Sequence, residues 1–283
     1  MARLKILAAA WLAAGFGCAA AAAPRVVTLA PHLAELVCAA GACEDLVGVS
    51  AWSDFPATLD QLPRIGDAQS VNLEAVLALR PSLVLAWDGG TPPETVARLR
   101  GLGLRVERLR VRDLDDVAAA LETLGAWLGT ENLARRAAAD YLARLARLRA
   151  RWQGAAPVRV VYQIETAPAY SVNRDSPISR ALAVCGGVNV FADLPTLAAP
   201  VSAEAMLAAQ PEAVFYGAEE NAQAMRAYWA RLAATPAARA GNLFAVQADR
   251  LARATPRLLD GIAQACADLD LARKRLSALR AAK

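Results

Sequence analysis

Residues 72–87, NLEAVLALRPSLVLAW, decide the fold of this chain, because a similar segment, SAEAMLAAQPEAVFYG, recurs at residues 202–217. The two segments align without a gap at an offset of 130 residues. Each one predicts a capped helix that ends near a proline and continues into a buried strand. Two such segments so far apart predict two similar lobes, and two lobes imply a cleft between them. The identical positions are Glu74/Glu204, Ala75/Ala205, Leu77/Leu207, Ala78/Ala208, Pro81/Pro211 and Val84/Val214.

Helices alternate with strands on both sides of the repeat, which predicts an α/β fold with parallel sheets in two Rossmann-like lobes. Between the lobes, the stretch 131–152 contains neither glycine nor proline and has apolar residues at helical spacing. It predicts one connecting helix of roughly 30 Å, long enough to cross between lobes and to limit their hinge motion. We expect lobes at 24–112 and 157–283, joined by a helical linker at 113–156.

The first 23 residues have the order of a secretory signal peptide: two basic residues, an apolar run and an alanine-rich cleavage region. The apolar run is shorter than the roughly 20 residues that a membrane span needs. This pattern predicts export to the periplasm. Lipid attachment at Cys18 is the alternative to simple cleavage. The net charge of +4 is too small to indicate a nucleic-acid partner.

Four cysteines remain after cleavage, and they allow three complete pairings. An oxidising compartment and an even number of cysteines favour disulfides. We expect a long-range bridge Cys185–Cys266 in the second lobe and a local bridge Cys38–Cys43. Free buried thiols are the alternative for the local pair, because its loop is short.

Aromatic residues recur where the predicted strands end, at the edge where open α/β sheets bind ligands. Their flat faces suit a broad apolar or macrocyclic ligand, although each ring could instead pack in a core or a loop. Trp52 and Trp87, which stand beside turn residues, carry this prediction best. The residues at these strand ends are Trp52, Trp87, Tyr170, Tyr216 and Asp249, with Arg253 just after.

No catalytic motif is present, and a single histidine, His32, excludes the ligand clusters of zinc or other transition-metal sites. The sequence contains no nucleophile elbow and no phosphate-binding glycine loop. The arginine-rich runs 98–112 and 144–151 are interpreted as solvated faces. We therefore expect that the protein is not an enzyme and that it carries no cofactor.

Glu74 and Glu204 occupy the first turns of the two repeated helices, behind the N-caps Asn72 and Ser202. Acidic residues are stabilised there by the helix dipole, which is a sufficient structural explanation for either one. Their symmetric placement also puts one negative charge at the same place on each lobe, as binding to a partner with pseudo-two-fold symmetry would require.

Taken together, these features resemble the cobalamin-binding receptors of bacterial ABC importers, the BtuF-like group of helical-backbone (class III) solute-binding proteins. The resemblance covers nearly all of the mature chain. It rests on the order and spacing of PRVVTLAPHLAELVCAAG, GVSAWSDFP, NLEAVLALRPSLVLAWDGG, AVCGGVNVF, PVSAEAMLAAQP and RATPR.

The resemblance implies a monomer that holds cobalamin or a related corrinoid in its cleft and closes only slightly. It implies that Glu74 and Glu204 pair with arginines of the membrane permease, and that Cys185 and Cys266 form a disulfide. The residues it implies as ligand contacts are Trp52, Trp87, Tyr170, Asp249 and Arg253.

The chain departs from the family at two positions where tryptophans are expected, since it has Ala68 and Ala198. Because this aromatic surface is lost, a corrinoid other than cobalamin remains an alternative ligand. A siderophore or haem receptor of the same fold is the alternative, and its anionic ligand would require arginines in the cleft. The candidates for that role are Arg64, Arg174 and Arg253.

Overall fold

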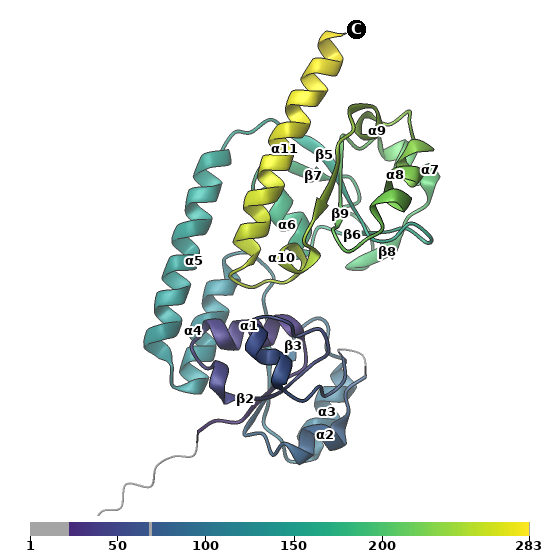
Figure 1. The fold of residues 1–283 in the computed structure, drawn as a ribbon. Coiled ribbons are helices and arrows are strands. Elements are labelled where there is room, and N and C mark those ends of the chain that lie inside the picture. Colours follow the sequence, from purple (N-terminus) through teal and green to yellow (C-terminus); the bar gives the residue numbers. More distant parts are fainter. Residues whose placement is uncertain (1–22, 68–69, 283) are drawn as a thin grey trace, which may run out of the picture.

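The computed structural model describes residues 23–67 and 70–282. The predicted signal peptide before residue 23, Cys18 and Ala68 lie outside the described residues. Two lobes, each built around a four-stranded parallel sheet, stand at opposite ends of a helical scaffold (Figure 1). The predicted α/β fold with parallel sheets is thereby confirmed.

The N-terminal sheet has the order β2-β1-β3-β4, and the C-terminal sheet has the order β10-β9-β5-β7. Read from its other edge, the second order repeats the first, because in both lobes the first strand lies between the second strand and the strand of the repeated segment. The N-terminal strands are β1 (Val26–Thr28), β2 (Leu46–Val49), β3 (Leu83–Trp87) and β4 (Val106–Leu109). The C-terminal strands are β5 (Val158–Gln163), β7 (Gly187–Asn189), β9 (Ala213–Gly217) and β10 (Leu243–Val246).

Helices flank both sheets, and an antiparallel ribbon of β6 (Tyr170–Val172) and β8 (Ala198–Pro200) is added to the second lobe. The ribbon is too short to show alternating polarity in the sequence, so it was not predicted. The helices of the lobes are α1 (Pro31–Ala39), α2 (Leu73–Ala78), α3 (Pro93–Gly101), α6 (Pro177–Ala183), α7 (Ala203–Ala209), α8 (Ala222–Ala230), α9 (Pro236–Ala240) and α10 (Ala248–Ala252).

The repeated segments fold alike, as α2 and β3 in one lobe and as α7 and β9 in the other. The side chains of Asn72 and Ser202 cap the two helices by accepting from the backbone N–H three residues on, at 3.0 and 3.2 Å. A residue in the left-handed conformation follows each helix: Arg80, with φ 45°, comes two residues after α2, and Gln210, with φ 44°, is the C-cap of α7. This conformation is compatible with the proline that follows, since proline disfavours a right-handed helical residue before it.

The two helix ends are also tied to the first strand of each lobe in the same way. The Arg25 guanidinium donates to the carbonyl oxygen of Leu79 at 2.8 Å, and that of Arg159 donates to the carbonyl of Ala209 at 2.6 Å. The internal symmetry therefore extends to side-chain contacts outside the repeated segment.

Three long helices connect the lobes: α4 (Asp116–Leu128), α5 (Glu131–Trp152) and α11 (Leu258–Ala281). The span of α5 matches the predicted connecting helix, and the left-handed Gly129 ends α4 just before it. The two helices pack closely at Gly125, where a Cβ atom would clash with the side chain of Ala134.

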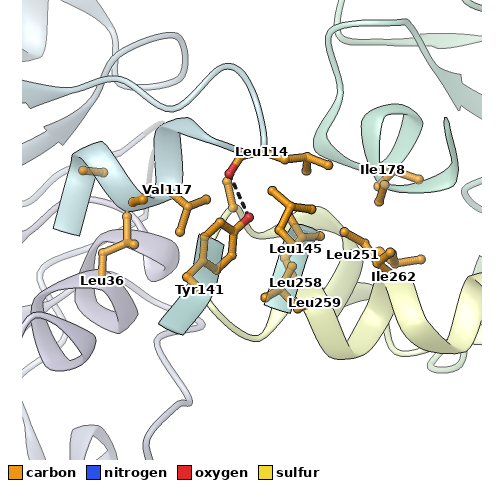
Figure 2. Close-up of a cluster of buried hydrophobic side chains, with 14 of the residues drawn as sticks. Leu36, Leu114, Val117, Tyr141, Leu145, Ile178, Leu251, Leu258, Leu259 and Ile262 are labelled. Atoms are coloured by element: carbon orange, nitrogen blue, oxygen red, sulfur yellow. Dashed lines mark hydrogen bonds between the residues drawn. The ribbon is translucent and has the colours of Figure 1, made fainter. Parts of the chain in front are cut away.

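A single hydrophobic core runs through these helices and joins the lobes (Figure 2). At one side, Leu36 of α1 and Val117 of α4 pack near Tyr141 of α5. Farther along, Leu145 of α5 lies beside Leu258 at the start of α11. The buried Tyr141 hydroxyl donates to the carbonyl of Leu114 at 2.8 Å. A shared core of this kind opposes the free hinge motion of separately folded domains.

Two disulfides reinforce the lobes. Cys38 and Cys43 join the end of α1 to the following turn, and Cys185 and Cys266 join the segment after α6 to α11. Across residues 23–67 and 70–282, no helix is both long and apolar enough to span a membrane. The same residues contain no group of three or more metal-ligating side chains.

Candidate functional site

A cleft of about 780 Å³ opens between the lobes. Its N-terminal wall comes from the segments that follow β1, β3 and β4, at the carboxyl edge of the parallel sheet. Its C-terminal wall comes from the segments around β6 and β8 and from the end of α10. Ligands of open α/β sheets bind at this edge, so the cleft is the candidate binding site.

Trp87, the last residue of β3, gives the N-terminal wall its largest apolar surface. Its ring packs edge-on against His32, with ring centroids 5.2 Å apart and planes at 81°. The Trp87 ring leaves no room for a Cβ atom at Gly90, so glycine is needed at that turn. Both rings line the cleft, where they offer a mixed aromatic surface to a flat ligand.

Burial lowers the pKa of His32 to about 4, and the charge of Arg253 lowers it in the same direction. The imidazole is therefore neutral at neutral pH. A neutral ring beside Trp87 adds no charge of its own to the cleft.

Arg253 connects the lobes at the cleft wall. Its Nη1 donates to Glu35 at 2.8 Å and to Asp54 at 2.5 Å, and its Nη2 donates to the carbonyl of Trp52 at 2.9 Å. Glu35 also accepts from Thr255 and from Arg257. The Glu35 side chain is only 2% exposed, so this carboxylate is compensated within the protein and not by water.

Only some of the predicted ligand contacts line the cleft. Trp87 and Arg253 line the cleft, whereas Trp52, Tyr170 and Asp249 are not among its lining residues. Asp249 pairs with Arg257 at 2.9 Å, and Tyr170 pairs with Pro200 in the β6–β8 ribbon. Trp52 is held next to Arg253 through its carbonyl, in a left-handed conformation with φ 64°, and the residue is 78% exposed. The ring is thus free to meet a ligand.

Tyr216 was expected to face a ligand, and this expectation is wrong. Its side chain is 4% exposed and packs in a core cluster with Val161 and Met206. Ala198, by contrast, is exposed on β8.

Arg108, Arg110 and Arg112 were interpreted as part of a solvated run, yet all three line the cleft. They alternate along β4 and the extended chain beyond it, and this period of two was the sequence signal for a shared face. Arg64 and Arg174 are not among the lining residues. They form ion pairs with Asp60 and Asp193.

Glu74 and Glu204 are exposed in the first turns of α2 and α7. A hydrogen bond from its own backbone N–H and one from Ser202 lower the pKa of Glu204. One helical turn on, Leu77 and Leu207 are 37% and 38% exposed. Each lobe therefore presents a carboxylate beside an apolar side chain, in matched positions.

Two parallel α/β lobes joined by a rigid helical scaffold around one cleft define a two-lobed ligand receptor. The chain belongs to the periplasmic binding protein family, whose model matches residues 26–249. It is 36% identical to the vitamin B12-binding protein of Vibrio cholerae serotype O1 over 89% of this chain and 91% of the relative. The vitamin B12-binding protein of Pectobacterium carotovorum is 35% identical over 92% and 94% of the two chains.

Solved structures agree with this assignment. The crystal structure of the periplasmic vitamin B12-binding protein BtuF of Vibrio cholerae superposes with a TM-score of 0.83 at 35% identity, covering 89% of this chain and 98% of that one. A periplasmic haem-binding protein from Pseudomonas aeruginosa superposes with a TM-score of 0.76 at 32% identity, covering 86% and 91%.

Proposed function

We propose that this protein is a non-enzymatic periplasmic receptor that captures cobalamin or a related corrinoid and delivers it, as a monomer, to an ABC permease. The observation that carries the proposal is the inter-lobe cleft with the Trp87 and His32 rings on its wall, in a chain 36% identical to a vitamin B12-binding protein. A corrin ring has a broad, flat apolar face, which matches this wall.

The proposed contacts are two residues that line the cleft, Trp87 and Arg253, and three that are not among its lining residues, Trp52, Tyr170 and Asp249. Trp87 packs against the ring from the N-terminal lobe, and the exposed Trp52 covers it from the side of Arg253. Arg253 and Asp249 belong to one charged network through Glu35 and Arg257, and they offer a donor and an acceptor for amide side chains of the ligand. Tyr170 contributes from the ribbon of the second lobe.

Titration with cyanocobalamin, followed by tryptophan fluorescence and calorimetry, tests the proposal. We expect a one-to-one complex at micromolar or lower ligand concentration. Trp87→Ala should weaken it by about tenfold or more, because one aromatic face is lost. Trp152→Ala is the matched control, since this tryptophan lies at the end of α5 and is not among the lining residues. Absence of binding to the unaltered protein would refute the corrinoid assignment.

A haem or siderophore receptor is the second candidate, and the arginines of the cleft favour it. Arg108, Arg110 and Arg112 would suit an anionic ligand, and one similar structure is a haem-binding protein. Competition decides between the candidates: haem that displaces cyanocobalamin at equal concentration would support the second.

Delivery requires docking, for which we propose the exposed ends of α2 and α7. The paired Glu74 and Glu204 fit two basic sites on a two-fold or pseudo-two-fold permease, and Leu77 and Leu207 add an apolar contact at each. Both helices are fixed to their lobes by the Arg25 and Arg159 hydrogen bonds, so the surfaces are pre-organised.

A further inference from the structure

Three arginines follow one another at alternate positions on the N-terminal wall of the cleft. Arg108 lies near the end of β4, which is an edge strand of its sheet, and Arg110 and Arg112 continue beyond it. All three line the same cavity as Trp87. Their side chains therefore border the aromatic wall on which a flat ligand would lie.

These arginines are only partly neutralised. The Asp88 carboxylate forms ion pairs with two of them, at 3.1 Å from Nε of Arg108 and at 2.5 Å from Nε of Arg110. The hydrogen bond from Arg110 is the largest cause that lowers the pKa of Asp88. One carboxylate therefore faces two guanidiniums, and the structure shows no ion pair for Arg112 within the described residues.

Other charged groups also lie around this wall. Asp113 and Asp175 both pair with Arg180 on the opposite lobe, and Asp116 accepts from backbone N–H groups of residues 112 and 113. Arg253 is engaged by Glu35 and Asp54. Of the three arginines, Arg108 and Arg110 thus share one carboxylate, and Arg112 has no ion pair among the described residues.

We propose that Arg108, Arg110 and Arg112 form an oxyanion subsite that selects corrinoids carrying a phosphodiester or free carboxylates at their periphery. The inference rests on the proposed corrinoid-binding function and deepens it by naming the ligand class. Guanidinium groups bind phosphate and carboxylate through paired N–H donors, which gives both affinity and orientation. With the macrocycle packed against Trp87, its peripheral groups reach the strand end where the arginines lie.

Three corrinoids separate the two sources of the oxyanion. Cyanocobalamin has a phosphodiester and amide side chains, cobyrinic acid has carboxylates and no phosphodiester, and dicyanocobinamide has neither. Calorimetry measures the affinity of each for the unaltered protein, for Arg112→Gln and for the double variant Arg110→Gln/Arg112→Gln. Arg98→Gln is the matched control, because this exposed arginine lies on α3 and is not among the lining residues.

Loss of a charged hydrogen-bond donor in this half-open site should weaken binding of a corrinoid that carries an oxyanion by about tenfold. The affinity for dicyanocobinamide should stay unchanged, and 0.5 M salt should weaken binding of the two oxyanion-bearing ligands more in the unaltered protein than in the double variant. If the variants lose affinity only for cyanocobalamin, the phosphodiester is the bound group. If they lose affinity only for cobyrinic acid, the carboxylates are the bound groups.

The proposal is overturned if dicyanocobinamide binds as tightly as both oxyanion-bearing corrinoids, or if the variants weaken the binding of all three equally. If none of the three binds the unaltered protein, the corrinoid function fails and the subsite fails with it. Thermal unfolding of each variant shows whether the fold is retained, and Arg112→Lys should keep part of the selectivity because it keeps the charge.

Discussion

Arg253 of the second lobe lies 2.8 Å, from its Nη1 atom, from Oε1 of Glu35 on the first helix of the N-terminal lobe. The chain separates these residues by 218 positions, yet the contact is nearly closed to solvent, with Glu35 2% and Arg253 15% exposed. A buried carboxylate between two guanidiniums stabilises one relative placement of the lobes, because separation would leave these charges unpaired.

Replacing Glu35 by Ala should lower the free energy of unfolding by about 3–5 kcal/mol, because Arg253 and Arg257 would lose a buried partner. Urea unfolding, followed by circular dichroism, measures the change. Asp60→Ala is the control, since it breaks an exposed ion pair with Arg64 and should cost at most about 1 kcal/mol. Equal losses in the two variants would contradict a special role for Glu35.

Stability should decrease as the pH falls from about 6.5 to about 4, in part because of His32. Burial lowers the pKa of the folded imidazole from 6.5 to about 4, so in this range the unfolded chain binds a proton that the folded chain does not. This contribution to the free energy of unfolding is present above pH 6.5 and lost on acidification, and it amounts to about 3 kcal/mol. Denaturant unfolding of the unaltered protein and of His32→Gln across this range isolates it. Parallel pH profiles would show that His32 is not responsible.

The two disulfides should contribute unequally. Cys185–Cys266 closes 81 residues and Cys38–Cys43 only 5, so loop-closure entropy predicts about 4–5 kcal/mol for the first and about 2 kcal/mol for the second. Unfolding of the two double Cys→Ser variants compares these values. A larger loss for the short loop would indicate that local packing around α1, and not loop closure, dominates.

Replacing both Glu74 and Glu204 by Gln should reduce ATP-driven uptake of the ligand in proteoliposomes that contain the permease. The affinity for the ligand should be unchanged, because both residues are exposed on helices outside the cleft lining. The control is Glu94→Gln with Glu131→Gln, which removes two exposed acids from the first turns of α3 and α5. Equal uptake in both double variants would leave helix stabilisation as the role of Glu74 and Glu204.

Elements with strong local signals were predictable from the sequence. The helix α5 was predicted at 131–152, because the segment lacks glycine and proline and glycines stand close to both ends. The strands Leu46–Val49, Val158–Gln163 and Leu243–Val246 are short runs rich in apolar residues, which is the local pattern expected of buried strands. In each case local composition and tertiary packing favour the same structure.

The parts that escaped prediction depend on contacts between distant segments. Tyr216 has the same place in β9 as Ala86 in β3, and only the packing of the lobe decides that it points into the core. Glu35 stands within an apolar helix, and nothing near it in the sequence indicates its role, because its partners follow more than 200 residues later. Arg108, Arg110 and Arg112 carried a signal in their alternate spacing, but that spacing alone does not show which face meets the cleft.

The shared core and the Glu35 contacts also bear on how tightly a partner can be held. A scaffold that keeps the lobes in one arrangement also fixes the separation between the ends of α2 and α7. Once one end has bound, the other is presented to its own site at a high effective concentration, so two individually weak contacts can give strong combined binding. Any partner that recognises both ends must therefore match their fixed spacing, and specificity for the correct permease would depend on distance as well as on charge.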